Sequence, residues 1–390
     1  MARSHTVTLK LGREGLAVTA WDEITLTLDL LNPGNPWTVT LWRSRNGAAW
    51  VRVREAAELL APVTVEIDGA VQLCGVLERI KDGAGRAGAP LTLSGRDLLA
   101  GALVADVDPR LQMRDATLEE VIERALAPLQ IPVTVGVSAD EVRHIQAGAR
   151  PGTRAGSGGR TRRRQHIDRF KPRPGQRVWQ FLAELARRHG YLLYAGPWGG
   201  GVGLVIDRPA YDAAPVGTLT RQRQRDGTWR GNLLDGTLDL NATDVPTEVT
   251  VYGHTRLSAP QDARHRATLA NDWMRTAERV AATFAPRPRY VRDSRARTPK
   301  IAAQRARHVI HRAMADFAVY EATVQGFAFG SPARLWTINS MVTLADELTG
   351  TRGNWLVTRV GFSRSRQGGH TTHLRLVPPG SIDLEPDSEV

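Results

Sequence analysis

Alternating apolar and polar residues dominate the first hundred positions of the chain. Val7, Leu9 and Leu11 fall on one face of an extended segment, and residues 24–30 repeat the alternation. A period of two predicts strands that each bury one face. Turns rich in Gly and Pro separate further strands of this kind at 37–42, 63–67, 71–80 and 91–95. Short strands at this spacing predict an antiparallel barrel, because closure removes exposed edges.

The apolar pattern changes to a helical period after residue 100. Thr117 and Glu120 form a capping box before an apolar stripe from Leu118 to Leu129. A second helix is predicted over 177–190, with Gly190 placed to end it. A strand pair around the glycine-rich turn of Gly199 to Gly203 follows. These elements predict a small inserted α/β domain over residues 101–208.

Strands resume at 236–254, and two helical stripes follow, from Ala270 to Phe284 and from Ala302 to Phe317. An extended basic connector, "PRPRYVRD", joins them. The chain then returns to alternating strands and ends with a hairpin over 354–379, in which we expect Phe362 to face the core and Arg364 the solvent-side tip.

The predicted fold class is mainly β with α+β insertions: two antiparallel β-barrels, a small inserted α/β domain and a helical segment. The first barrel is expected over 1–100 and the insert, with an Arg/Gly-rich loop, over 101–208. The second barrel is expected over 209–380, with inserted helices at about 262–318, and residues 381–390 form a C-terminal tail.

Composition places the chain among folded globular proteins. Its 390 residues suit two or three domains, and the 42% hydrophobic and 24% charged residues exclude a fibrous or wholly disordered chain. We expect no membrane span, because no apolar run approaches the roughly 18 residues required, and no export signal, because the N-terminus enters a strand at once. Cys74 is the only cysteine, which excludes an internal disulfide and a cysteine-based zinc site. We expect it to pack as a small buried hydrophobe.

The net charge of +12 is concentrated in one segment. Between Arg150 and Arg177 there are ten basic residues and one acidic residue, Asp168, so this window carries +9. Such a loop could contact nucleic acid or an acidic neighbouring subunit. Phe170 alone is available for base stacking, so the loop lacks an aromatic platform. The candidate electrostatic contact residues are Arg154, Arg160, Arg162, Arg163 and Arg164.

Candidate catalytic and metal-binding residues are sparse. His370 and His373 are three apart on a predicted strand and therefore point to opposite faces, while His308 and His311 lack a third ligand nearby. Asp106 and Asp108 precede a proline, as in a turn. The sequence contains no G-x-S-x-G elbow, phosphate-binding loop or H-E-x-x-H motif. No catalytic residue, cofactor or metal is predicted, although a carboxylate-pair enzyme would leave little trace.

Several stretches resemble, in the same order, the baseplate hub of contractile phage tails, in particular the Mu-like tail and late-control group. They are "VTVEIDGAVQLCGVLERI" with "LTLSGRDLLAGALV", "KPRPGQRVWQFLAELARRHGYLLY", "TEVTVYGH", the "RPR" connector, the helix with "AAQRA", and the segment from Leu335 to Pro379. The Arg/Gly-rich stretch at 147–164 has no counterpart in that pattern.

This resemblance implies a non-enzymatic homotrimer whose two tube-protein-like barrels per chain form a pseudo-sixfold ring. Such a ring joins the sixfold tail tube to the threefold central spike, with baseplate wedge proteins around it and the tape measure protein near its lumen. Genomic DNA would be met, if at all, only in transit through the lumen. The implied location is the virion, after assembly in the host cytoplasm. Related hubs occur in type VI secretion spike proteins.

Two other functions are left open by the sequence. The first is a nucleic-acid-binding module that uses the basic 150–177 segment. The second is a cell-wall-degrading tail enzyme.

Overall fold

The computed structural model describes residues 5–85, 88–111, 118–129, 134–137, 172–188, 190–198, 201–253, 266–270, 286–293, 296, 298–315, 317–366 and 368–382. The alternating segments of the sequence pair into one 14-stranded sheet. Its strands run in the order β12-β11-β20-β21-β3-β4-β7-β6-β5-β1-β2, and β22, β17 and β13 continue from β21. Mainly β structure with α+β insertions, as predicted, is thereby confirmed.

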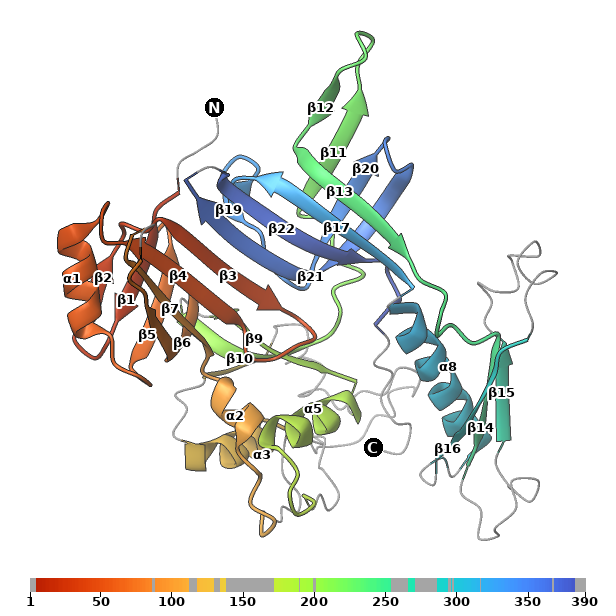
Figure 1. Ribbon diagram of the computed structural model, residues 1–390. Coiled ribbons are helices and arrows are strands. Elements are labelled where there is room, and N and C mark those ends of the chain that lie inside the picture. Colours follow the sequence, from red (N-terminus) through yellow and green to blue (C-terminus); the bar gives the residue numbers. More distant parts are fainter. Residues whose placement is uncertain are drawn as a thin grey trace, which may run out of the picture.

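The first half of the sheet comes from the N-terminal hundred residues and curves around a dense core (Figure 1). Alternation decides which face is inside: Trp37, Val39 and Leu41 of one strand are at most 1% exposed. The strands are β1 (Val7–Leu11), β2 (Leu16–Val18), β3 (Glu23–Asp29), β4 (Pro36–Trp42), β5 (Pro62–Ile67), β6 (Ala70–Asp82) and β7 (Pro90–Asp97).

A helix, α1 (Gly47–Ala56), interrupts these strands where none was predicted. It buries only Trp50 and Val53, which are three residues apart and so share a helix face. Two buried positions in ten residues, among other apolar residues that stay more exposed, make too weak a helical pattern to distinguish from strand and turn, which is why the sequence did not indicate this helix.

The second half of the sheet comes from the C-terminal part of the chain. Its strands are β11 (Gly217–Arg223), β12 (Trp229–Gly231), β13 (Leu233–Leu240), β17 (Ala318–Gln325), β20 (Ser340–Asp346), β21 (Thr351–Ser365) and β22 (Gly369–Val377). A separate short hairpin, β18 (Ala328–Phe329) with β19 (Arg334–Leu335), lies between β17 and β20 in the chain.

Strand β21 joins the two halves. Its first part pairs with β20 and, after an irregularity between Val357 and Arg359, its last part pairs with β3. Arg359 Nε reinforces the joint by donating to Asp29 Oδ2 at 2.7 Å. Side chains from both halves belong to one hydrophobic cluster. The two predicted barrel regions are therefore two parts of one continuous sheet with a shared core.

The C-terminal hairpin confirms the predicted place of Phe362 and corrects that of Arg364. Phe362 is 3% exposed and packs edge-on against Phe327, with ring centroids 5.3 Å apart. Arg364 shares the face of Phe362, lies within β21 opposite Ile24 of β3 and is half-buried, so it is not at a solvent-side tip. The tip itself is attached to the first half of the sheet, because Arg366 Nε lies 3.1 Å from an oxygen of the buried Asp22 carboxylate.

The α/β insert packs around its own hydrophobic cluster, drawn from residues 99 to 206. Strand β8 runs parallel to β10, and β10 pairs antiparallel with β9. Gly190 (φ +79°) follows the second predicted helix, as expected. Thr117 of the capping box lies outside the described residues. The elements are α2 (Ala100–Val104), α3 (Leu118–Leu126), η1 (Ala127–Leu129), β8 (Thr134–Val137), α5 (Val178–Arg188), β9 (Leu192–Trp198) and β10 (Gly201–Asp207).

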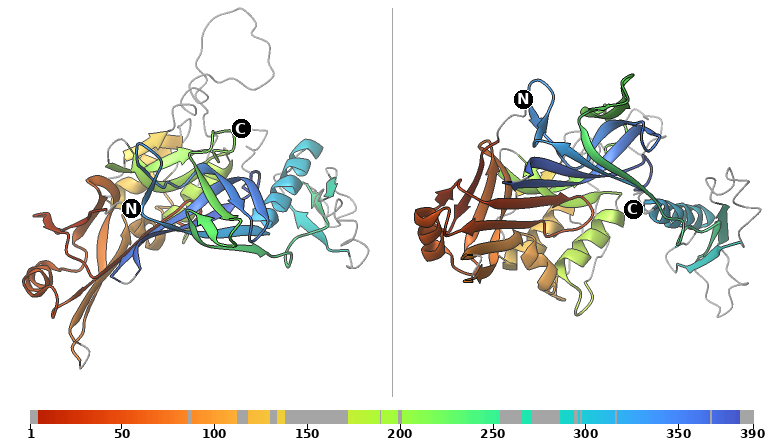
Figure 2. Two further views of the ribbon diagram at one scale, coloured as in Figure 1. Left: turned by 90° about the horizontal axis from the view of Figure 1, so that it is seen from above. Right: turned by 45° about the horizontal axis from the view of Figure 1, so that its top comes forward.

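A third unit, which we name the peripheral module, consists of β14 (Glu248–Tyr252), β15 (Arg266–Ala270), β16 (Pro288–Arg292) and α8 (Pro299–Ala315). Its strands form a separate sheet in the order β15-β14-β16, and it stands apart from the large sheet in two views (Figures 1 and 2). The range predicted as helical, about 262–318, therefore contains two strands as well as a helix. Ala270 ends β15, and the rest of the first predicted stripe lies outside the described residues.

Helix α8 matches the second predicted stripe. Ala302 and Ala306 are fully buried against the small sheet, whereas Phe317 is buried just beyond the helix. The basic connector is β16 with its flanks. Among the described residues, no helix has the length and apolar composition needed to cross a membrane.

Candidate assembly site on the β11–β12 arm

Residues 217–235, which we name the arm, project from one end of the large sheet (Figures 1 and 2). The arm reverses direction at a tight turn where Gly227 has φ +82°. Asp226 Oδ1 accepts hydrogen bonds from Thr228 Oγ1 at 2.6 Å and Thr228 N at 2.9 Å. These bonds lower the pKa of Asp226 below its ordinary value. The tip is thus an ordered turn with a negative charge at its end.

The arm exposes apolar and basic side chains together. Trp229 is 43% exposed and Leu234 55% exposed, while Arg223, Arg225 and Arg230 are exposed around them. Large apolar side chains cluster on a surface mainly where another molecule covers them. The arm therefore has the composition of a contact surface.

The outer edge of β12 is an edge of the sheet at which a further strand could pair. Within the part of the chain that the structure describes, β12 pairs with β11 alone. Just beyond β12, Asn232 continues the pairing with its side chain, since Oδ1 accepts from Thr220 N and Nδ2 donates to Thr218 O, both at 2.8 Å. A short edge strand of this kind can accept a strand from a neighbouring chain.

The foot of the arm is fixed by a buried ion pair. Arg221 donates from Nε to Asp346 Oδ1 at 2.8 Å and from Nη2 to Oδ2 at 2.6 Å. The same carboxylate accepts from Tyr320 Oη at 2.6 Å, Thr349 Oγ1 at 2.8 Å and Leu348 N at 3.1 Å. A two-pronged arginine contact is the strongest geometry for a carboxylate. The arm is exposed, but its attachment is rigid.

This network shifts two pKa values in opposite directions. Burial opposes the charge of Asp346, but the hydrogen bonds from Arg221, Tyr320 and Thr349 outweigh it and hold the pKa of Asp346 far below its ordinary value. Burial and the neighbouring carboxylate raise the pKa of Tyr320. Asp346 is therefore ionised and Tyr320 protonated wherever the protein is folded near neutral pH.

Gly236 on β13 makes the network possible. A Cβ atom at this position would lie 2.0 Å from Tyr320 Oη, closer than any real contact. The absence of a side chain lets the phenol reach Asp346, while the Gly236 carbonyl accepts from Arg221 Nη2 at 3.3 Å.

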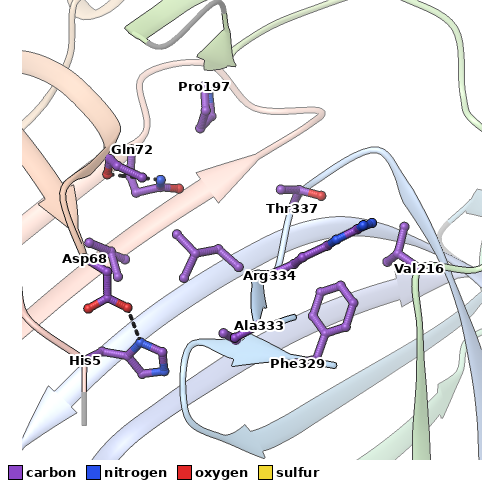
Figure 3. A pocket seen from close by; sticks show the side chains of 13 residues that line it. His5, Asp68, Gln72, Pro197, Val216, Phe329, Ala333, Arg334 and Thr337 are labelled. Atoms are coloured by element: carbon purple, nitrogen blue, oxygen red, sulfur yellow. Dashed lines mark hydrogen bonds and ion pairs between the residues drawn. The ribbon is translucent and has the colours of Figure 1, made fainter. Parts of the chain in front are cut away.

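A hollow of ≈ 580 Å³ lies between the first half of the large sheet and the β18–β19 hairpin, and Val216, just before the arm, also lines it. Figure 3 shows His5 and Asp68 of the first half on one wall, joined at 2.6 Å, and Phe329 and Arg334 of the β18–β19 hairpin on the other. A second hollow of ≈ 700 Å³ shares His5 and Phe329 and reaches Leu234 of the arm. The arm thus continues into a recessed surface to which both halves contribute.

His370 lies beside these hollows in an aromatic cluster. Its ring centroid is 5.0 Å from that of Phe327 and 6.0 Å from that of His5, and its buried Nε2 has no hydrogen-bond partner among the described residues. Burial, followed by the positive charge of Arg364, lowers the pKa of His370 below its ordinary 6.5.

The lowered pKa of His370 predicts that the protein loses stability in mild acid. Below pH 6.5 the unfolded chain binds a proton at this position that the folded chain excludes, so the free energy of unfolding falls as the pH falls. His370→Phe removes the titration, and its urea unfolding midpoint should drop less between pH 7.5 and 5.5 than that of the unchanged protein. His373→Phe, on the exposed side of the same strand, is the control. Equal drops in all three proteins would contradict the assignment.

The structure describes some of the candidate site residues from the sequence and leaves others outside the described ranges. Arg154, Arg160, Arg162, Arg163 and Arg164 lie outside the described residues, so the electrostatic contact loop stays a prediction. His370 is half-buried and His373 exposed, in agreement with their expected opposite faces. His311 Nδ1 lies 2.5 Å from the Gly380 carbonyl oxygen.

The remaining candidates also have structural partners. Asp106 pairs with Arg177 at 3.0 Å, and Asp108 caps the backbone of Arg110 at 2.8 Å, as in the expected turn. Cys74 is half-buried in β6, and burial raises the pKa of its thiol. Across the described ranges, no group of three or more His, Cys, Asp or Glu side chains is placed to share a metal ion.

The arm is the part of the site that the sequence interpretation missed. Its turn carries an Asp-Gly pair at 226–227, a strong local hairpin signal. The exposure of Trp229 and Leu234 has no such signal, because apolar residues in a strand are normally expected to face a core.

Comparison with known proteins supports the fold. No protein-family model and no curated protein matches the sequence. Among solved structures, a 43 kDa tail protein from prophage MuSo2 of Shewanella oneidensis has a TM-score of 0.73 at 20% identity, covering 97% of this chain and 100% of that one. A tail protein from Neisseria meningitidis has a TM-score of 0.75 at 21% identity and covers 99% of each chain.

A component of the Escherichia coli type VI secretion system, described as structurally similar to T4 bacteriophage tail proteins, is more distant. Its TM-score is 0.50 at 10% identity, covering 97% of this chain and 79% of that one. The chain has the fold of Mu-like prophage tail proteins along nearly its whole length. The resemblance inferred from the sequence is confirmed at the level of the fold.

Proposed function

We propose that this chain is a structural protein of a contractile phage tail, and specifically its trimeric baseplate hub. The observation that carries the proposal is the end-to-end similarity of its fold to two prophage tail proteins, with 97% or more of each chain covered. A structural role also suits the assembly site, whose exposed arm and recessed surface offer contacts rather than a set of reacting groups.

The proposed hub joins the sixfold tail tube to the threefold central spike. Each chain carries two strand groups within one sheet, so a ring of three chains presents six of them. The six strand groups of such a ring can contact a sixfold structure, and its three chains can contact a threefold structure. Its further partners are baseplate wedge proteins and the tape measure protein. Its place is the virion, after assembly in the host cytoplasm.

The arm is proposed to contact the next chain of the ring. A head-to-tail contact joins two different surfaces, and the branched 14-stranded sheet ends at β12 with the arm, at β2 and at β13, so β12 and β2 are two different edges. Exposed Leu59 and Leu60 precede β5 in the half that contains β2. Apolar residues are thus available at both ends of the sheet for such a contact.

Light scattering of the purified protein tests this proposal. Three chains of 42.7 kDa give an expected mass of about 128 kDa. The double change Trp229→Ser and Leu234→Ser should shift the mass toward that of one chain, with a circular dichroism spectrum that stays that of a folded chain, because both side chains are exposed in the single chain. Leu240→Ser, at a residue 59% exposed at the far end of β13, is the matched control. A trimer unaffected by the double change would exclude the arm from the contact, and a protein that stays monomeric with its spike would contradict the hub.

A further inference from the structure

Among the described residues, helix α8 covers one face of the sheet of the peripheral module and no element covers the other, which we name the open face. Val249 and Val251 of β14 are fully buried and share a hydrophobic cluster with Ala302 and Ala306 of α8. Figure 1 shows α8 between this sheet and the rest of the chain. The opposite face of the sheet therefore points away from the molecule.

Strand register sets tyrosines and arginines side by side on this open face. Tyr252 of β14 lies opposite Arg266 of β15 and opposite Arg292 of β16, so the tyrosine stands between two arginines. In the next row Tyr290 of β16 lies opposite Thr250. The rings of Tyr252 and Tyr290 have centroids 6.3 Å apart and planes inclined by 31°, so they form two adjacent surfaces.

These side chains are not used to stabilise the core. Tyr290 is 63% exposed, and Arg266 and Arg292 are exposed as well. Arg266 lies over the ring of Tyr252, with its guanidinium carbon 5.6 Å from the centroid. An aromatic ring combined with cations and left open to solvent is suited to a flat, negatively charged ligand.

The whole module is basic. Its described residues between 246 and 315 contain two carboxylates, Glu248 and Asp293, and eight exposed basic residues: Arg266, Arg287, Arg289, Arg292, Lys300, Arg305, Arg307 and Arg312. One of the carboxylates, Asp293, already faces Arg305 at 3.4 Å. Arg266 and Arg292 flank Tyr252 on the open face, and the other basic residues add to a positive charge of the module that attracts a polyanion.

We propose that the open face of the peripheral module binds single-stranded nucleic acid. Bases of any sequence can stack on Tyr252 and Tyr290, while Arg266 and Arg292 on either side of Tyr252 contact the phosphates. Double-stranded DNA keeps its bases stacked within the duplex and cannot use the tyrosines. The site thus differs from the Arg-rich 150–177 segment, which lacks aromatic partners, and it does not depend on the hub assignment.

Fluorescence anisotropy with a labelled oligothymidylate of about 16 nucleotides, the upper end of common site sizes, tests the proposal. Tyr290→Ala and Tyr252→Ala are each expected to weaken binding to the intact protein roughly 5- to 140-fold, as loss of one stacking partner does. Arg292→Ala should lower the slope of log affinity against log salt by about 0.7. Arg225→Ala removes one positive charge on the arm, away from the proposed site. In this variant, each tyrosine change should weaken binding by the same factor as in the unchanged protein.

Three outcomes would overturn the proposal. The first is no binding of the oligothymidylate. The second is binding whose affinity does not change in either tyrosine variant, which would assign the binding to charge alone. The third is equal competition by a duplex of equal length. Photocrosslinking gives a second readout, because crosslinked peptides should contain Tyr290 or Tyr252. Light scattering of the Tyr290, Tyr252 and Arg292 variants keeps this test separate from the hub, since these three changes do not touch the arm.

Discussion

Asp346→Ala is expected to destabilise the folded chain by about 3 to 5 kcal/mol, the cost of removing one partner from a buried ion pair. The change leaves the Arg221 guanidinium, whose side chain is 10% exposed, without its carboxylate. It also removes the acceptor of the Tyr320 and Thr349 hydroxyls. Urea unfolding followed by circular dichroism at neutral pH measures the loss, since the carboxylate contributes above its ordinary pKa of 3.8.

Two further variants test whether the loss of stability comes from the buried charge. Asp239→Ala, at an exposed carboxylate on β13, should change the free energy of unfolding by no more than about 0.5 kcal/mol. Asp346→Leu combined with Arg221→Met should be less destabilising than Asp346→Ala, because no charge is left buried. A loss below about 1 kcal/mol for Asp346→Ala would mean that the foot of the arm is not held by this network.

Phe362→Ala is expected to cost about 3 to 5 kcal/mol, as for other buried aromatic residues cut back to alanine. Phe362 is 3% exposed, packs edge-on against Phe327 and lies opposite Leu26 of the first half. A cavity there weakens the part of β21 that joins the two halves of the sheet. The urea unfolding midpoint should fall. Both halves should unfold in one transition, because they share one core.

Leu348→Ala is the matched control, since this side chain is 59% exposed and should change stability by no more than about 0.5 kcal/mol. If Phe362→Ala unfolded in two separate transitions, the halves would be independent and the shared core would be contradicted. If it unfolded like the unchanged protein, the packing around Phe327 would not matter to the joint.

Patterns of period two and period 3.6 were enough to predict most elements of the fold. The alternation through Val7, Leu9 and Leu11 produced a buried face, and Phe362 faced the core as expected. Gly190 followed its helix because a left-handed conformation is readily available to glycine. Local periodicity suffices for such elements because each buries one face. The domain boundaries at 100 and 208 stay predictions.

Pairing between distant segments could not be predicted from local pattern. The change of β21 from β20 to β3 follows from a bulge and from an ion pair between Arg359 and Asp29, which are 330 residues apart. Strand β15 fell within the range expected to hold helices because it is short and exposes most of its side chains. A strand without a buried face carries little alternation.

The assembly site was hidden from sequence analysis for a related reason. Arg221 and Asp346 are 125 residues apart, and neither is unusual in its local sequence. Trp229 and Tyr290 are aromatic residues that a sequence pattern assigns to a core. Only the fold shows that their side chains face solvent, and it is this exposure that marks both proposed contact surfaces.

The central claim is that three copies of this chain form the ring between tail tube and spike, and electron cryo-microscopy of the assembled tail tests it most directly. We expect three copies at that junction, with the six strand groups facing the tube and the β11–β12 arm of each chain against the next chain. Density showing the chain in six copies, repeated along the tube, or absent from the junction would contradict it.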